Sequence, residues 1–281
     1  MKTFLELFYE SINQDVKKLM NKVKNINLNN NIESSDAFSL YIELIRKIRD
    51  YKYETSVEFI DKIVRDKKLK FLLSLGYGGD FADLKLNIVS RQLPTASLIP
   101  TQSEIDMTNS LKYTLQGKDI DVCFYDPVVI IRPIITFNGK YIVDGHHRWS
   151  QIFITNPNSN LACLDIQGHL TPVDMLKAVQ STIGSNLGYL ESRDTKGTSL
   201  YTANEGTIRR YVQTNISQKT ITEFNKLGIT DPIEYLVQNS LKIKNNQPIK
   251  NAPKRGFMPQ TSHDPQLFSD LKNGITDPKR I

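Results

Sequence analysis

A short segment near the middle of the chain constrains the fold more than any other. Asn138-Gly139 is a strong signal for a tight hairpin turn, and the apolar residues Tyr141–Val143, which follow Lys140, suit a strand. Asp144-Gly145 comes next, and Trp149–Ile154 is a helical stretch. Glycine lets the backbone turn sharply between two such elements. The sequence therefore predicts a hairpin whose second strand passes through a tight turn into a helix.

Further apolar runs alternate with helical stretches around this segment. Pro127–Ile131 is rich in β-branched residues and suits a buried strand, and Leu161–Ile166 suits another. Leu98-Ile99 leads into a proline-containing turn, and we expect a helix over Ile105–Leu115. The alternation predicts a small mixed-sheet α+β core over residues 84–168, flanked by helical segments.

The flanking regions carry helical patterns. In residues 1–75, apolar residues recur at three- and four-residue steps. Asp36 is the expected cap of a second helix there, and Thr55–Glu58 fits a capping box for a third. We expect residues 169–241 to form a helical region after the core. Gly76–Gly79 is interpreted as a linker, because no Gly-Lys-Ser/Thr follows it as in a phosphate-binding loop.

The tail over residues 242–281 differs in composition from the rest of the chain. It carries five prolines among lysines and asparagines. Such a segment cannot bury enough apolar surface to offset the entropy of ordering, so we expect it to be extended or disordered and to add little to the core. An alternative is that Lys250–Phe257 docks onto a protein partner.

Composition excludes several classes of protein. The 281 residues include 36 Lys and Arg against 30 Asp and Glu, a net charge of +6 that permits nucleic-acid contact without requiring it. No apolar run approaches the roughly 18–20 residues that span a bilayer, and Glu6 and Glu10 interrupt the stretch where a secretory signal is apolar. Cys123 and Cys163 lack the spacing of a zinc site. We expect a soluble cytoplasmic protein with no membrane partner.

The turn between the predicted strand and helix carries the candidate chemistry. A helix N-terminus presents free N–H groups and the positive end of its dipole to an anion. Arg148 adds a planar fork suited to phosphate, His146 and His147 add donors, and Asp144 can hold a metal ion or accept a proton. The pattern predicts a phosphate-binding strand–turn–helix. Two alternatives stay open: a structural arginine beside surface histidines, and a His/Asp metal site, for which no third ligand is visible.

Residues Ile142–Trp149 resemble the Asp-Gly-His-His-Arg signature of the ParB/sulfiredoxin superfamily, in the variant of free serine kinases and ParB-like phage proteins. Leu98–Gln102 takes the place of the family's first strand and its turn, and Pro127–Ile131 takes the place of its Pro-Ile-Val-Val strand. The resemblance covers roughly residues 90–168. It implies binding of a nucleotide (ATP, ADP or CTP) by its phosphates, together with Mg²⁺.

The resemblance also implies roles for single residues. Asp144 would hold the Mg²⁺ and take part in catalysis. The acid that serves the kinases as base aligns with Gln102, so Glu104, two residues further on, is the candidate base. His146 is a further catalytic candidate, and it stands where sulfiredoxin has its catalytic cysteine, which excludes that reductase chemistry. The residues implied to contact the nucleotide are Gln102, Gly145, His146, His147 and Arg148.

These expectations together favour a nucleotide-dependent phosphotransferase or nucleotide hydrolase. The resemblance to ParB-like phage proteins further implies a phage origin. Two alternatives belong to other classes. One is a DNA-associated ParB-like module that uses the nucleotide as a switch or cleaves DNA, and its binding should fall steeply with salt. The other is a phage structural protein that retains the fold and fills the turn with its own side chains.

Overall fold

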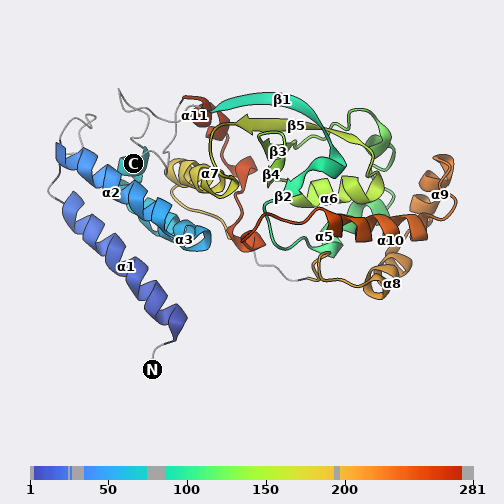
Figure 1. Ribbon diagram of the computed structural model, residues 1–281, viewed down its shortest axis with the longest axis horizontal. Coiled ribbons are helices and arrows are strands. Elements are labelled where there is room, and N and C mark those ends of the chain that lie inside the picture. The colour runs from blue at the N-terminus through green and yellow to red at the C-terminus, as the bar shows by residue number, and fades with distance from the viewer. Residues whose placement is uncertain (1–2, 25, 27–34, 75–85, 193–196, 274–281) are drawn as a thin grey trace. The chain divides into compact units, whose positions relative to one another are not determined.

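The chain forms two compact units, each assembled from segments that are distant in the sequence (Figure 1). The computed structural model describes residues 3–24, 26, 35–74, 86–192 and 197–273. Unit 1 comprises residues 1–87, 168–191 and 259–281, and unit 2 comprises 88–167 and 192–258. The predicted helical region 169–241 is thus divided between the units. The predicted linker Gly76–Gly79 lies outside the described residues.

Unit 1 is helical. Its helices are α1 (Phe4–Val23), α2 (Ser35–Asp50), α3 (Tyr53–Val64), α4 (Lys67–Ser74), α7 (Pro172–Leu187) and α11 (Leu267–Asn273). The apolar stripes predicted from residue spacing face inward, as at Ile12, Ile45 and Ile60. Helices α3 and α4 both pack against α7, whose residues from Met175 to Ser185 are all buried. Helix α7 is therefore the centre of this core.

Two predicted helix starts in unit 1 are wrong. Helix α3 begins at Tyr53, so Thr55 and Glu58 lie inside it and form no capping box. Helix α2 begins at Ser35, so Asp36 lies in its first turn. A capping box does form at α1, where the Thr3 hydroxyl accepts from the Glu6 N–H and the Glu6 carboxylate accepts from the Thr3 N–H. Packing of the apolar face extends α2 and α3 beyond the local cap signals.

A buried lysine joins α7 to the end of α2. The Lys177 ammonium donates to the carbonyls of Ile48, Arg49 and Tyr51 at 3.1, 2.7 and 2.6 Å. The last carbonyls of a helix have no partner within it and carry the negative end of its dipole. Burial lowers the pKa of Lys177, while these three acceptors compensate for its lost hydration. Lys177 is a structural cap.

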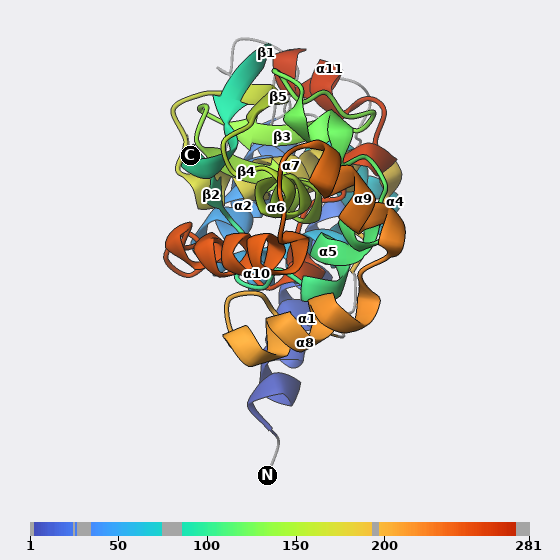
Figure 2. The ribbon, with the colours of Figure 1, turned by 90° about the vertical axis from the view of Figure 1, so that its right-hand side faces the viewer.

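Unit 2 is an α+β unit built on a mixed five-stranded sheet. The strand order is β1-β5-β3-β4-β2, which Figure 2 shows from top to bottom. Strand β4 pairs parallel with β2 and antiparallel with β3, and β3 pairs parallel with β5. The strands are β1 (Asn87–Pro94), β2 (Ile99–Pro100), β3 (Ile134–Phe137), β4 (Tyr141–Asp144) and β5 (Asn160–Gln167). The predicted mixed-sheet α+β class is confirmed at this level.

The helices of unit 2 pack on one another beside the sheet. They are α5 (Met107–Leu115), α6 (His146–Thr155), α8 (Glu205–Asn215), α9 (Gln218–Lys226) and α10 (Pro232–Lys242). Helix α6 contacts α5, α10 and strand β3. Its Trp149, Ile152 and Phe153 are buried in the core of the unit. This packing fixes the start of α6 at the edge of the sheet.

The predicted hairpin forms between β3 and β4. Asn138 and Gly139 have φ angles of +51° and +64°, the pair of positive values that a type I′ turn requires. The fully buried Asp165 accepts hydrogen bonds from the Gly139 N–H at 2.7 Å and from the Thr136 hydroxyl at 2.8 Å. A buried carboxylate from β5 thus holds the turn, and its role is structural.

The predicted buried strand over Pro127–Ile131 is wrong. Val128 makes one isolated bridge, and Ile131 is fully exposed. The strand beside the hairpin is instead Ile134–Phe137, with all four residues buried. It begins directly after Pro133, because proline has no N–H to donate to a sheet ladder and is confined to strand starts and edges.

The predicted extended tail is also wrong over residues 242–273. Within unit 2, the Ile249 N–H donates to the Pro100 carbonyl and the Ser103 N–H donates to the Pro253 carbonyl. Within unit 1, α11 buries Leu267 and Leu271 completely. The prolines interrupt regular structure, but the apolar residues between them are enough to pack. The segment 250–257, the alternative docking segment, therefore contacts its own chain.

Candidate functional site

Two parallel strands bring the predicted site residues to one edge of the sheet. Strands β2 and β4 pair in register at Pro100 and Ile142, so the residues after both strands meet at the same end. The Thr101 hydroxyl donates to the Ile142 carbonyl at 2.5 Å and ties these ends together. Beyond β2 come Gln102 and Glu104, and beyond β4 comes the turn that starts α6.

Gly145 forms that turn and is the N-cap of α6. Its φ of +94° lies in the left-handed region, which glycine adopts without strain. A Cβ placed on it would lie 3.0 Å from the Arg148 guanidinium and 3.2 Å from the Ile134 side chain. The turn thus needs glycine for both its backbone angle and its space. Since glycine has no side chain, the N-cap residue itself makes no side-chain hydrogen bond to α6.

Asp144 and Arg148 form a polar pair across this turn. Asp144 Oδ1 accepts from the Gly145 N–H at 2.6 Å, and Asp144 Oδ2 lies 3.7 Å from Arg148 Nη2. Arg148 also donates to the Arg132 carbonyl. Burial lowers the pKa of Arg148, and the Asp144 carboxylate opposes that change. The predicted phosphate ligand and the predicted metal ligand are therefore in contact.

The predicted catalytic role of His146 does not fit its surroundings. The side chain is buried, and its Nε2 accepts from the Thr101 N–H at 3.1 Å. Burial lowers the pKa of His146 to about 3, with the nearby His147 and Arg148 acting in the same direction. The ring is neutral near pH 7 and has one nitrogen engaged, so it positions the end of β2 and does not transfer protons.

His147 has a similar positioning role on the other side. Its Nε2 accepts from the Asp106 N–H at 3.1 Å, and the Asp106 carboxylate caps α5 through the Asn109 N–H at 2.7 Å. The two histidine rings of the motif thus bind backbone N–H groups of the 101–106 segment.

Gln102 and Glu104 lie in the loop between β2 and α5. Gln102 is buried, and its amide donates to the Glu104 carbonyl, which stiffens the loop. Glu104 Oε2 is a buried oxygen that no hydrogen bond from the described residues reaches. Among those residues, no hydrogen bond or ion pair joins Glu104 to Asp144 or Arg148. The candidate base Glu104 thus lies in the loop that follows β2, but it does not bond to the Asp144–Arg148 pair of the turn.

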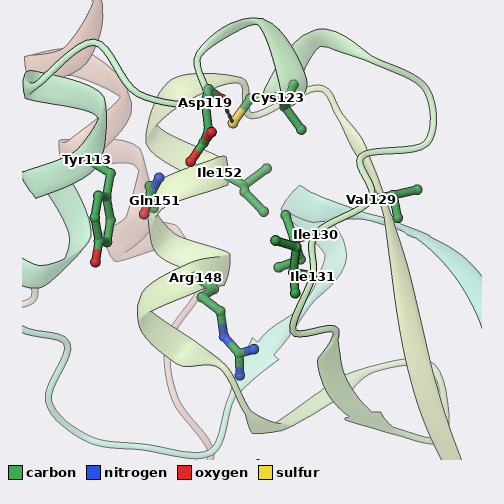
Figure 3. A pocket seen from close by; sticks show the side chains of 10 residues that line it. Tyr113, Asp119, Cys123, Val129, Ile130, Ile131, Arg148, Gln151 and Ile152 are labelled. Atoms are coloured by element: carbon green, nitrogen blue, oxygen red, sulfur yellow. Dashed lines mark hydrogen bonds between the residues drawn. The ribbon is translucent and has the colours of Figure 1, made fainter.

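Arg148 also lines a pocket of about 390 Å³. Figure 3 shows the Arg148 side chain on the same face of α6 as Gln151 and Ile152, with Ile130 and Ile131 on the opposite wall. The apolar run 127–131 predicted a buried strand, whereas its exposed side chains border the pocket.

Polar groups complete the pocket. Tyr113 reaches it from α5, and Asp119 reaches it from the turn that follows α5. Arg148 and Gln151 are spaced so that they lie on one face of a helix, and this spacing is the sequence signal that could have identified Gln151 as a lining residue. Asp119 carried no signal, because its position depends on how the 117–132 segment folds back over α6.

The fold and the turn define an α+β unit with a glycine-capped strand–turn–helix and an arginine at the edge of a pocket. Comparison with family models, curated proteins and solved structures gives no match to the chain. Within the described ranges, no three or more His, Cys, Asp or Glu side chains gather so that they could hold a metal ion. None of the described helices is long and apolar enough to cross a membrane.

Proposed function

We propose that unit 2 binds a nucleotide by its phosphates at the turn Asp144–Arg148 and acts as a nucleotide-dependent phosphotransferase or hydrolase. This is the function that the resemblance to the ParB/sulfiredoxin superfamily implies. The observation that carries the proposal is the Arg148 guanidinium, which sits in the first turn of α6 and also borders a pocket. An arginine in that place can bind a phosphate while the pocket holds the rest of the ligand.

The start of α6 supports the phosphate part of the proposal. Its N-cap is Gly145, which carries no side chain, and the positive end of the helix dipole favours an anion there. Arg148 adds a fork that matches two phosphate oxygens. Catalysis in phosphoryl transfer comes mainly from such positioning and charge stabilisation.

Asp144 fits a role as the single protein ligand of Mg²⁺. This ion commonly takes one or two carboxylates and completes its shell with water and substrate phosphates, so the absence of a larger cluster among the described residues does not conflict with it. When bound, Mg²⁺ would offset the negative charge of the phosphate oxygens. Without it, the Asp144 carboxylate holds the Gly145 N–H and faces Arg148, and so competes with phosphate for both groups.

Glu104 is the candidate base of the proposed reaction. A buried carboxylate oxygen without a hydrogen-bond donor is costly in a folded protein, and a substrate hydroxyl or water would supply the missing donor. Glu104 would take the proton of that hydroxyl while the hydroxyl oxygen forms a bond to phosphorus. The bond between phosphorus and the leaving nucleotide oxygen would break in the same step.

The test of phosphate binding is the Arg148→Ala variant. Each hydrogen bond to a charged group contributes about 1.5–3 kcal/mol, so we expect nucleotide affinity to fall roughly 10- to 150-fold. Arg148→Lys should recover part of the loss, because lysine offers a point charge in place of a fork. Calorimetric titration with ATP, ADP, CTP and GTP in the presence of Mg²⁺ measures the effect.

The matched control is Arg210→Ala, which removes an exposed arginine of α8 and should leave affinity unchanged. If Arg148→Ala binds every nucleotide as well as the parent, the phosphate site is wrong and Arg148 is structural. If the parent binds a nucleotide but releases no phosphate and transfers none, the enzyme part is wrong, and the DNA-associated nucleotide switch becomes the better proposal.

Asp144→Asn separates binding from turnover. The substitution keeps the shape of the side chain and removes the charge that competes for Arg148. Nucleotide affinity measured without Mg²⁺ should therefore be equal to the parent or higher, while phosphate release with Mg²⁺ should be lost. Weaker binding without the metal would contradict the competition between Asp144 and phosphate.

A further inference from the structure

The pocket beside Arg148 has the size and lining of a small-molecule site. Its volume of about 390 Å³ falls in the usual range of roughly 300–1,000 Å³ for ligand pockets, which are mostly apolar with a few placed polar groups. Ile130, Ile131 and Ile152 supply apolar walls. All of the lining residues belong to unit 2, so the pocket is complete within that unit.

The mouth of the pocket exposes apolar side chains that a ligand would cover. Ile131 is fully exposed, Val129 is 65% exposed and Tyr113 is 46% exposed. Clustered exposure of large apolar groups around a concave site is typical of binding sites. The Tyr113 ring faces the pocket (Figure 3), and an aromatic ring is a platform on which a nucleobase stacks. The lining therefore favours a flat, largely apolar group.

The polar groups of the pocket indicate which hydrogen-bonding atoms the flat group of the ligand carries. No hydrogen bond or ion pair from the described residues reaches the Asp119 carboxylate or the Gln151 side-chain amide. Figure 3 shows the Asp119 carboxylate directed toward Gln151 in the space next to Tyr113. An ionised carboxylate only accepts hydrogen bonds. A ligand that satisfies Asp119 must therefore present a hydrogen-bond donor, and on a flat ring an exocyclic amino group is such a donor.

Helix α6 sets the spacing between the two ends of the ligand. Arg148 and Gln151 lie three residues apart on the same face, which corresponds to about 4.5 Å along a helix. A nucleotide with its phosphate at Arg148 would extend along this face past Gln151 and Ile152, toward the part of the pocket where Asp119 lies.

We propose that this pocket holds the base of the nucleotide and that Asp119 selects bases with an exocyclic amino group. Cytosine and adenine carry such a group, whereas uracil and hypoxanthine carry a carbonyl oxygen in its place. A carbonyl oxygen next to the Asp119 carboxylate would leave two acceptors facing each other without a proton between them. This inference rests on the proposed function, because it needs the phosphates at Arg148.

The test compares matched nucleotide pairs on the full chain. We expect CTP to bind more tightly than UTP, and ATP more tightly than ITP, by about 10- to 150-fold, the range of a hydrogen bond to a charged group. Asp119→Asn should reduce this ratio to within about threefold, because an asparagine amide both donates and accepts. Calorimetric titration of the parent and the variant gives the ratios directly.

A neighbouring acid provides the control. Asp121 is exposed and its carboxylate accepts from the Tyr125 hydroxyl, and it does not line this pocket. Asp121→Asn should therefore keep the full preference for the amino-bearing base. A second variant, Ile131→Ser, removes an exposed apolar wall and should weaken all four nucleotides alike without changing their ratios.

The outcomes separate this inference from the proposed function. Equal binding of CTP and UTP, and of ATP and ITP, by the parent overturns the role of Asp119 while nucleotide binding stands. The role of Asp119 is also overturned if Asp121→Asn abolishes the preference as Asp119→Asn does. If the parent binds none of the nucleotides, the proposed function itself is overturned. If Arg148→Ala binds all four nucleotides more weakly but keeps the affinity ratios of the two pairs, the proposed function and this inference are both supported.

Discussion

Gly145 links the backbone of the turn to the chemistry of its side chains. The left-handed φ of +94° at this residue directs the chain from β4 into α6, and the space beside its Cα is taken by Arg148 and Ile134. An L-residue in the left-handed region costs roughly 1–2 kcal/mol, and a methyl group here would also push on the Arg148 guanidinium. One residue thus controls both the stability of the turn and the placement of its arginine.

Gly145→Ala should therefore lower the free energy of unfolding by about 1–3 kcal/mol, measured by urea denaturation. Gly206→Ala is the matched control, because Gly206 lies in α8 and its nearest neighbour would be 3.5 Å from the added Cβ. Alanine there should be neutral or stabilising by up to about 1 kcal/mol. Equal effects at the two glycines would contradict the steric argument.

His146 should make stability depend on pH. The unfolded chain protonates this ring near its ordinary pKa of 6.5, whereas the folded chain keeps it neutral down to a pKa of about 3. The unfolded state binds more protons between these values, so the free energy of unfolding falls as the pH is lowered from 6.5 to 3. At about 1.4 kcal/mol for each pKa unit, the loss is on the order of several kcal/mol.

His146→Gln should be less stable than the parent at pH 7 but should lose less stability on acidification, because its amide carries no proton to gain. Urea unfolding at several pH values measures this difference. His169→Gln, which replaces an exposed histidine, should keep the pH dependence of the parent. If His146→Gln and the parent lose the same free energy between pH 6.5 and 4, His146 is not the group responsible.

At the scale of single residues, the sequence predicted which residues form the turn better than it predicted what their side chains contact. It placed His146, His147 and Arg148 between a strand and a helix, since strand and helix signals are local, although α6 begins at His146 and not at the predicted Trp149. It did not predict that both histidine rings bind backbone N–H groups of the 101–106 segment. Those contacts depend on the parallel pairing of β2 with β4, which has no local signal.

At the scale of elements, turn chemistry was the most informative signal. Asn138-Gly139 defined the hairpin because positive φ angles favour these two residue types. The apolar run 127–131 was misleading, since composition alone does not distinguish a buried strand from the exposed wall of a pocket. The tail over 242–273 was misjudged for the opposite reason, because a few apolar side chains among prolines packed into both units.

Truncation after Lys242 should therefore destabilise the protein. The removed segment buries Leu267 and Leu271 completely in unit 1. Each Leu→Ala change in a core costs about 2–5 kcal/mol, so Leu271→Ala alone should lower the melting temperature by several degrees. Leu7→Ala, which trims an exposed leucine of α1 in the same unit, should change it little. Unchanged melting of the truncated chain would show that α11 adds nothing to the core.

At the scale of the whole molecule, the chain passes between the two units four times. Local patterns predict helices and strands, but they do not show which helices share a core. The helix 172–187 follows the sheet in the sequence, yet its buried face belongs with α3 and α4. The division into consecutive helical regions could not anticipate this, because the pairing joins residues more than one hundred positions apart.

Removing residues 1–75 should expose α7 and leave unit 2 folded. Without α3 and α4, the buried face from Met175 to Ser185 loses its partners, whereas the core of unit 2 is formed by its own residues. We expect strong binding of the dye ANS, which reports exposed apolar surface, together with one retained cooperative transition in calorimetry. Supplying residues 1–75 as a separate chain should suppress the dye signal, because the same apolar faces can then associate. A truncated chain that binds no dye, or that shows no cooperative transition at all, would contradict the division of the core into two units.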